Sequence, residues 1–388
     1  MSSALERLPN ELLDQIISYL DIDPPSRAGV YQEPDQNITT SENKCIKHLS
    51  QSCARFANLV RPILFAHARI VLPGELSQFC WFTHKWELAR DIKSMTILVT
   101  DEHLQRDVRC GWINYLFGSI DPLRLTILAP PKFIGEALED MIDERHGWAF
   151  GIEYQILQLE QHNYGNVAAH QPNASENLLR TRPWTSFFFN EGSSLKAYNH
   201  YEYFLSQVPS VLGQWGQEFT QMNHSLKHEQ FFQGLESLTY TAIFPFYNHV
   251  ELVCIAMQLL PRLRVVTVQL APDENNHATE LEQRGSMDPN DPWMELESSY
   301  SVIGFKVRTQ SSVDEFRTRD LHIEAVRPQL MRSLGEELHG WTHDDDIQER
   351  LRRWSIRAAD FTREAETAQS GGSQLQLFMP RPHSFITS

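Results

Sequence analysis

The sequence predicts a mixed α/β protein, in which a helical N-terminal unit precedes a body of alternating strands and helices and further helices close the C-terminal end. Three observations favour this class: an amphipathic pattern at the N-terminus, a strand–helix rhythm of about 25 to 30 residues in the body, and two helical patterns near the C-terminus. The chain has 388 residues, of which 41% are hydrophobic, so it can bury a sizeable core.

The first element is a helix that begins near Pro9. Proline suits the first turn of a helix, because its missing N–H has no partner there and its φ is already set. Apolar residues then follow one helical stripe, at Leu12, Leu13, Ile16, Ile17 and Leu20. A stripe this wide has to be buried against the protein itself, a partner, or both.

A second helical pattern lies on the far side of a polar segment. Residues 24–43 are mostly polar and predict a loop. From residue 44 onwards, apolar residues again recur every three or four positions, at Ile46, Leu49, Cys53, Phe56 and Val60. Residues 1–69 are therefore predicted to form a small helical unit with a polar insertion at 24–43.

The body carries strand patterns separated by helical ones. Ser94–Val99 and Arg124–Ala129 share a Thr-Ile-Leu core and enclose a helical pattern over 103–117. A second pair of strand patterns, 235–240 and 260–265, encloses a helix over 249–259, and more strands are predicted at 152–159 and 184–189. This rhythm is typical of leucine-rich repeats, and it predicts an irregular α/β solenoid over residues 70–365. A non-repeating α/β domain is the alternative.

The C-terminal part is predicted to form a loop, a strand and two helices. Residues 272–300 hold eight acidic residues against one basic residue, which predicts an exposed loop, and 302–307 has a strand pattern. One helix would bury Leu330, Leu334, Leu338 and Trp341; the next would begin at Asp344–Asp346 and bury Ile347, Leu351, Trp354, Ala358 and Phe361. Residues 366–388 are predicted to be a flexible linker and tail.

Charge and composition exclude several classes of function. The net charge of −16 disfavours binding to nucleic-acid phosphates. No apolar run reaches the roughly 18 residues that a membrane span needs, and the N-terminus lacks a secretory signal pattern. Five scattered cysteines are typical of reduced thiols. These features predict a cytoplasmic and/or nuclear protein without nucleic-acid or membrane partners.

The sequence contains no recognisable catalytic pattern. It has no glycine-rich phosphate loop, no G-x-S-x-G nucleophile elbow and no C-x-x-C pair for zinc. His339 and His343 beside Asp344–Asp346 match no familiar spacing of metal ligands, and they are interpreted as part of an acidic helix start. The prediction is a protein that is not an enzyme and needs no cofactor or metal.

The N-terminal unit resembles the F-box motif. The resemblance rests on Leu8-Pro9-Asn10-Glu11-Leu12-Leu13 with Ile16-Ile17-Ser18-Tyr19-Leu20, on Leu49 to Phe56, and on Pro62-Ile63-Leu64-Phe65. It covers about 60 of the 388 residues, and it departs from the family in the polar insertion at 24–43. The remaining chain is similar, less specifically, to the divergent repeat-like domains of fungal F-box proteins, through Leu260-Pro261-Arg262-Leu263-Arg264.

The resemblance implies a substrate-recognition subunit of a Skp–cullin–F-box ubiquitin ligase. The F-box would bind the Skp-type adaptor and through it a cullin–RING ligase, while the C-terminal domain would bind an unknown client protein. The residues predicted to bind the adaptor are Leu8, Pro9, Leu12, Leu13, Ile16, Ile17, Leu20, Leu49 and Phe56. Two alternatives remain: an enzyme with a divergent active site in the α/β body, and an F-box scaffold that acts outside a ligase.

Overall fold

The fold was analysed in a computed structural model that describes eleven stretches of the chain: residues 7–19, 27, 29–39, 44–100, 106–162, 177–200, 207–221, 232–272, 288–324, 326–346 and 351–355. Within these stretches every helix is too short or too polar to cross a bilayer. The predicted linker and tail at 366–388 lie outside them, as does most of the acidic segment 272–300.

A single ten-stranded sheet organises the body. Its strands lie side by side in chain order, except that β10 is inserted between β8 and β9. The strands are β1 (His67–Leu72), β2 (Ser94–Val99), β3 (Arg124–Ala129), β4 (Gln155–Glu160), β5 (Ser186–Ser193), β6 (Ser237–Ile243), β7 (Val265–Gln269), β8 (Glu315–Thr318), β9 (Thr342–Asp346) and β10 (Leu351–Ser355).

The predicted leucine-rich-repeat solenoid is wrong, although the mixed α/β class is confirmed. Strands β1 to β3 are parallel to one another, and so are β5 to β8. Between these two groups, β4 runs antiparallel to both of its neighbours. A solenoid needs every coil to cross in the same direction, and the reversal at β4 breaks that regularity.

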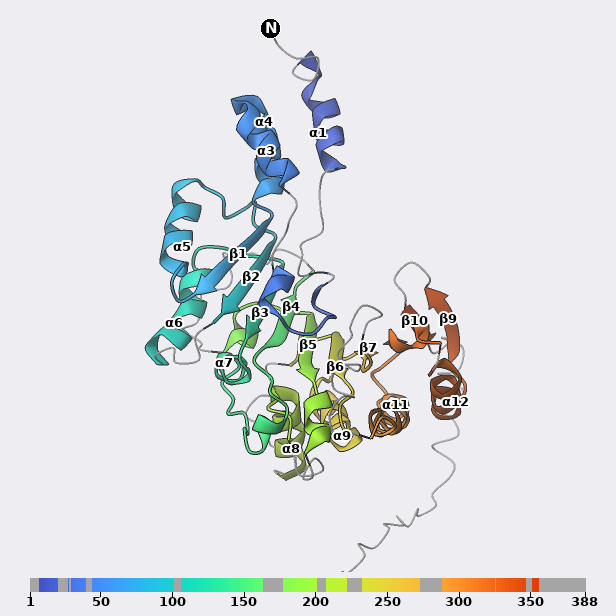
Figure 1. The fold of residues 1–388 in the computed structure, drawn as a ribbon. Helices are drawn as coiled ribbons and strands as arrows, with labels where there is room; N and C mark the ends of the chain where they lie inside the picture. Colours follow the sequence, from blue (N-terminus) through green and yellow to red (C-terminus); the bar gives the residue numbers. More distant parts are fainter. Residues whose placement is uncertain are drawn as a thin grey trace, which may run out of the picture.

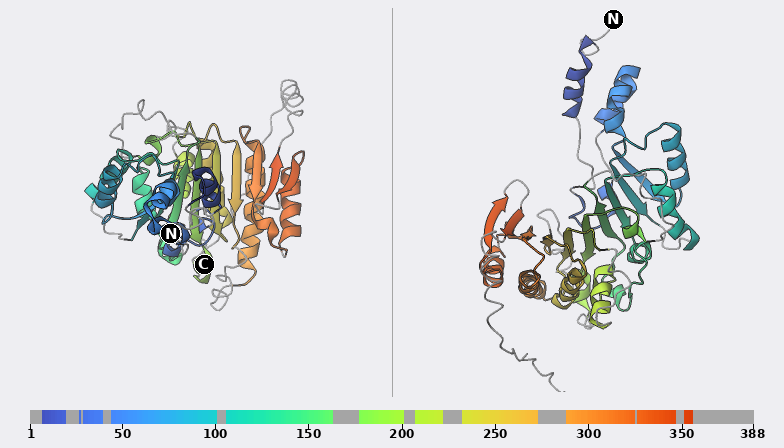
Figure 2. Two further views of the ribbon diagram at one scale, coloured as in Figure 1. Left: turned by 90° about the horizontal axis from the view of Figure 1, so that it is seen from above. Right: turned by 180° about the vertical axis from the view of Figure 1, so that it is seen from behind.

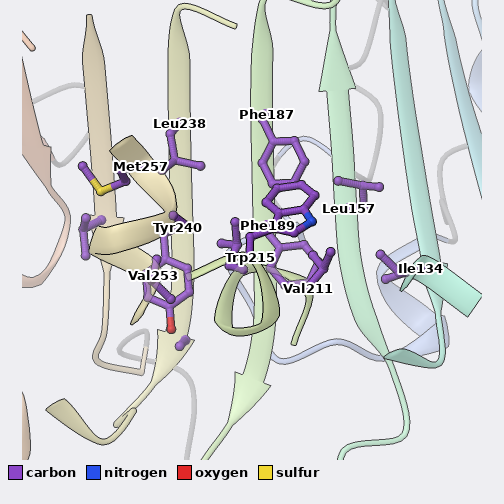
Figure 3. Close-up of a cluster of buried hydrophobic side chains, with 14 of the residues drawn as sticks. Ile134, Leu157, Phe187, Phe189, Val211, Trp215, Leu238, Tyr240, Val253 and Met257 are labelled. Atoms are coloured by element: carbon purple, nitrogen blue, oxygen red, sulfur yellow. The ribbon is translucent and has the colours of Figure 1, made fainter. Parts of the chain in front are cut away.

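Helices cover one face of the sheet, which curves so that they lie on its outer side (Figures 1 and 2). The helices of this layer are α5 (Leu76–Lys85), α6 (Arg106–Phe117), α7 (Pro131–Ala137), α8 (Val211–Gln221), α9 (Tyr247–Ala256), α11 (Asp291–Thr309) and α12 (Arg327–Glu337). The main hydrophobic core fills the space between this layer and the sheet. Figure 3 shows Trp215 of α8 in this core against Phe187 and Phe189 of β5.

Alternating burial along the strands explains which face the helices cover. In β6, Leu238 and Tyr240 are buried, whereas Ser237 and Thr239 are only half-buried. Successive side chains of a strand point to opposite faces, so the apolar set meets the helices and the polar set lines the other face. Strand β2 differs, because all six of its side chains are buried.

Two C-terminal predictions are wrong. Residues 302–307, predicted as a strand, belong to the long helix α11, whose start at Asp291 also shortens the predicted loop. The described residues of the helix predicted from Asp344 to Phe361 lie in two antiparallel strands, β9 and β10, which extend the sheet beyond β8. Asp344–Asp346 therefore lie in a strand and do not begin a helix. The predicted helix that buries Leu330 and Leu334 is confirmed as α12.

The N-terminal helices stand apart from the sheet. The helices α1 (Asn10–Ser18), α3 (Cys45–Ser52) and α4 (Ala54–Leu64) project together from the end of the body that carries β1 (Figure 1). They share a small core of their own, separate from the main one. The predicted boundary at residue 69 falls within β1, which begins at His67; the division of the chain into domains stays a prediction.

The segment between α1 and α3 packs on the helix-free face of the sheet. We call its residues 29–39 the strap. Its Val30 is buried in a cluster with Leu98, Leu128, Ile156 and Phe188, one side chain from each of the strands β2 to β5. The Asn190 side-chain amide donates hydrogen bonds of 2.7 Å to the carbonyls of residues 30 and 32. The predicted polar loop is thus, in its described part, anchored to the body.

Candidate partner-docking site

The stripe on α1 divides into a buried half and an exposed half. Leu13 and Ile17 are buried against Phe56 and Val60 of α4, and these four side chains form the centre of the small core. Residues four apart on a helix share one face, so Leu13 and Ile17 act as a pair. The protein itself therefore covers part of the stripe.

The other half of the stripe is open to solvent. Leu12 is 46% exposed, Ile16 is 42% exposed and Tyr19, at the end of the helix, is 80% exposed. Their spacing of four and three residues places the three side chains on one side of α1. Large apolar side chains grouped in this way are typical of a surface that binds another protein.

Arg55 fixes α1 against the following helices. Its guanidinium donates to the Leu8 carbonyl oxygen and to the Asn10 side-chain oxygen, both at 2.6 Å. Asn10 is the first residue of α1, so these bonds hold the start of α1 beside α4. The exposed residues Leu12 and Ile16 are thereby presented on a fixed helix.

The structure separates the predicted adaptor-binding residues into groups. Pro9, Leu12 and Ile16 are exposed, whereas Leu8 and Leu49 are half-buried. The other described members, Leu13, Ile17 and Phe56, are buried in the small core and cannot contact a partner without unfolding it. Leu20 lies outside the described residues. Tyr19 was missed, although it continues the spacing of Leu12 and Ile16.

The body contains a buried network of polar side chains around Glu191 on β5. Its carboxylate accepts hydrogen bonds from Tyr240 (2.6 Å) and Ser210, and it lies 2.8 Å from His249 Nε2. Burial, with the carboxylate beside it, raises the pKa of Tyr240 well above its ordinary value. All four side chains are buried, so the network joins α8, α9 and the sheet without facing solvent.

A second buried acid, Asp320, follows β8. Its carboxylate accepts from the backbone amides of Leu270 and Ala271 and from the Tyr300 hydroxyl, at 2.6, 3.2 and 2.5 Å. Burial raises the pKa of Asp320 to about 6. These contacts hold the ends of β7 and β8 to α11, and Asp320 and Tyr300 are both fully buried.

The raised pKa of Asp320 predicts a component of stability that falls as the pH rises. The folded-state pKa lies above the ordinary value of 3.8, so the native state binds the proton more tightly than the unfolded state. This contribution is full below about pH 4 and is lost by about pH 6, a change of about 3 kcal/mol in the free energy of unfolding. In Asp320→Asn this component is expected to vanish, which urea denaturation at a series of pH values measures against wild type. Parallel pH profiles for the two proteins would contradict it.

The described residues hold no group of three or more His, Cys, Asp or Glu side chains arranged to bind a metal ion. The chain matches no protein-family model, and no curated protein or solved structure matches it. Function is therefore inferred from the geometry of α1, α3 and α4, from the resemblance in their sequence, and from the surface of the sheet.

Proposed function

We propose that this protein is a substrate-recognition subunit of a Skp–cullin–F-box ubiquitin ligase, which binds the Skp-type adaptor through α1. The observation that carries the proposal is the exposed apolar side of α1, formed by Leu12, Ile16 and Tyr19 on a helix whose opposite side is already buried. A helix whose inner side holds its own core and whose outer side is apolar fits a helix-in-groove interface.

Burial of this exposed surface would contribute to the free energy of adaptor binding. Complete burial of one leucine or isoleucine contributes about 1.5–3 kcal/mol relative to its exposed state. Leu12 and Ile16 retain roughly half of their surface for a partner, and Tyr19 retains more. Because Arg55 already fixes the start of α1, little conformational entropy is lost on binding.

The client is proposed to bind the helix-free face of the sheet beside the strap. In β6 and β8 this face carries half-buried side chains that alternate with the buried ones, at Ser237, Thr239, Glu315 and Arg317, and Val265 at the start of β7 is half-buried as well. Within the described part of the chain, the helices α5 to α12 lie on the opposite face, and the strap with its 3-10 helix Gln36–Thr39 covers part of this one (Figures 1 and 2). A mixed polar and apolar surface on a rigid sheet suits recognition of a folded or extended protein segment.

Binding of purified Skp-type adaptor tests the proposal. Leu12→Asp/Ile16→Asp is expected to weaken binding at least about hundredfold, because both substitutions place a charge in the apolar contact. Met141→Asp, at a fully exposed apolar residue of the body, is the matched control and should bind as wild type. Circular dichroism confirms that both variants remain folded. Wild-type affinity in the double variant would show that α1 is not the docking surface.

Leu13→Ala separates docking from folding of the unit. Leu13 is buried in the small core, so this variant should lower the thermal stability of the N-terminal helices. It should weaken adaptor binding only in proportion to the fraction of molecules in which these helices are unfolded.

Co-purification of a cullin with the wild-type complex separates a ligase receptor from a scaffold that binds the adaptor alone.

The enzyme alternative has less support from the geometry. A catalytic group has to reach its substrate, and the acid, imidazole and hydroxyl groups that meet at Glu191 are all buried. The same is true of Asp320 and Tyr300. Their contacts join strands to helices, which favours a structural role.

A further inference from the structure

The helix α5 carries a group of aromatic side chains on the surface of the body. We define the α5 aromatic patch as Trp81, Phe82, Lys85 and Trp86. Trp81 is 59% exposed and Trp86 is 50% exposed, and Phe82 is exposed as well. Tryptophan is usually mostly buried, so two exposed tryptophans within six residues are unusual. The i, i+4 spacing pairs Trp81 with Lys85 and Phe82 with Trp86.

Two sets of contacts fix the patch: α5 packs against the body, and the side chains of the patch contact one another. On the inner side of α5, Cys80 and Thr83 are buried. On the outer side, the Lys85 ammonium lies 4.6 Å from the ring centre of Trp81 and 5.7 Å from that of Trp86. The Phe82 and Trp86 rings are 6.4 Å apart, and Arg61 of α4 donates a hydrogen bond to the Trp86 carbonyl. A surface fixed in this way loses little entropy when it binds.

The patch lies in the most basic part of an acidic chain. Residues 44–93 contain eight Lys and Arg against three Asp and Glu, whereas the whole chain has a net charge of −16. At physiological ionic strength charges act over about 8 Å, so a ligand on the patch interacts with the nearest cations, Lys85 and Arg61, which contact the two tryptophans. Lys85 places one of these charges between the two tryptophans.

We propose that the α5 aromatic patch binds an acidic protein segment that carries a large aliphatic or aromatic side chain. The apolar side chain packs on the exposed surface of Trp81 or Trp86, and a neighbouring carboxylate pairs with Lys85, which contacts both rings. Tryptophan is enriched among the residues that dominate binding at protein interfaces. The site is separate from the proposed adaptor surface, because α5 and α1 lie on opposite sides of the α3–α4 pair (Figures 1 and 2).

The charge of the chain favours a peptide over an anionic membrane. A membrane surface is extended and negative, so it interacts with the charge of the whole facing side of a chain whose net charge is −16. A peptide that covers only the patch meets Lys85 and Arg61. The same net charge also opposes the close approach of a second copy.

Selection from a displayed library of random peptides on the immobilised full chain tests this proposal. Wild type is expected to enrich peptides that combine Asp or Glu with Leu, Ile, Phe or Trp. Trp81→Ala/Trp86→Ala should lose this enrichment. Trp148→Ala, at an exposed tryptophan elsewhere on the surface, is the matched control and should retain it. No enrichment by wild type, enrichment of neutral or basic peptides, or equal enrichment by the double variant would overturn the proposal.

The affinity of the most enriched peptide provides the second readout. We expect Trp81→Ala/Trp86→Ala and Lys85→Glu each to weaken it at least about tenfold, and rising salt to weaken wild-type binding. Two further assays examine other occupants: sedimentation with phosphatidylserine vesicles, and the oligomeric state by analytical ultracentrifugation. Vesicle binding or dimerisation that depends on the two tryptophans, without peptide enrichment, would assign the patch to another occupant and overturn the proposal. Leu12→Asp/Ile16→Asp should bind the peptide as wild type does, so the two proposals can fail independently.

Discussion

Replacing Gly216 by alanine is expected to destabilise the protein by about 3 kcal/mol or more. Gly216 lies on α8, where that helix packs against α9. A Cβ atom at this position would lie 2.0 Å from the Leu252 carbonyl oxygen and 2.7 Å from its carbonyl carbon. Both are backbone atoms, so no side-chain rotation relieves the overlap and the two helices must separate. Adjacent core contacts, such as that of Trp215 with Phe187, would be loosened as well.

Gly335→Ala is the matched control, because it makes the same change inside another helix. An added Cβ on α12 meets no atom within 4 Å. Alanine is a better helix former than glycine, so this variant should be as stable as wild type or more stable by up to about 1 kcal/mol. Urea denaturation of both variants measures the difference. Equal stability of Gly216→Ala and wild type would mean that α8 and α9 are not packed as closely as described.

Replacing Glu191 by alanine is expected to cost about 3–5 kcal/mol in the free energy of unfolding, because it removes the acceptor that three buried groups share. Ser210, Tyr240 and His249 would each lose a hydrogen-bond partner in a place that water does not reach. Glu191→Gln keeps the shape and an acceptor oxygen, so it should cost less than alanine.

An exposed ion pair provides the comparison for Glu191. Arg145 and Asp143 form a bidentate contact on the surface, with the Arg145 side chain largely in solvent. Arg145→Ala should leave the free energy of unfolding unchanged within the error of a urea titration, because the Arg145 side chain is 76% exposed and such pairs contribute little. If Glu191→Ala were equally harmless, the buried network would not be holding the helices to the sheet.

Local patterns in the sequence were sufficient for the first strands of the sheet. The predicted strands Ser94–Val99 and Arg124–Ala129 are β2 and β3, and the helical pattern at 249–259 corresponds to α9 followed by a short 3-10 turn. In these segments the period of the apolar residues and the tertiary structure agree. The direction of each strand was not predictable. The reversal at β4 depends on the path of the connection between α7 and β4, and not on the residues of the strand itself.

Near the C-terminal end, the same spacing of apolar residues occurs once in a helix and once in a strand. The buried residues Leu296, Tyr300, Ile303 and Val307 recur at intervals of four, three and four, and they form α11. The residues Ile347, Leu351, Trp354 and Ala358 have the same intervals, yet Leu351 and Trp354 lie in β10. The edge of β8 and the ring of Phe316, 5.7 Å from Trp354, provide partners for a strand there. Tertiary pairing decided this segment, and no local pattern records it.

For the candidate docking site, the sequence identified the helix but not its orientation. The stripe on α1 contains both the residues that face α4 and those that face solvent, and adjacent members such as Leu12 and Leu13 cannot be assigned from spacing alone. That assignment depends on Phe56 and Val60, which lie more than forty residues along the chain. The strap was predicted only as a loop, because its buried Val30 and its neighbour Tyr31 follow no period.

The strap has a mechanical consequence for whatever binds α1. A unit joined to a body by one linker can swing about it, but this unit is attached at two points: through the strap between α1 and α3, and through the passage of α4 into β1. Tyr31 strengthens the first attachment, with its ring against Phe188 and under Arg319, 4.0 Å away. Two attachments restrict the motion of α1, α3 and α4 relative to the sheet more than a single linker would.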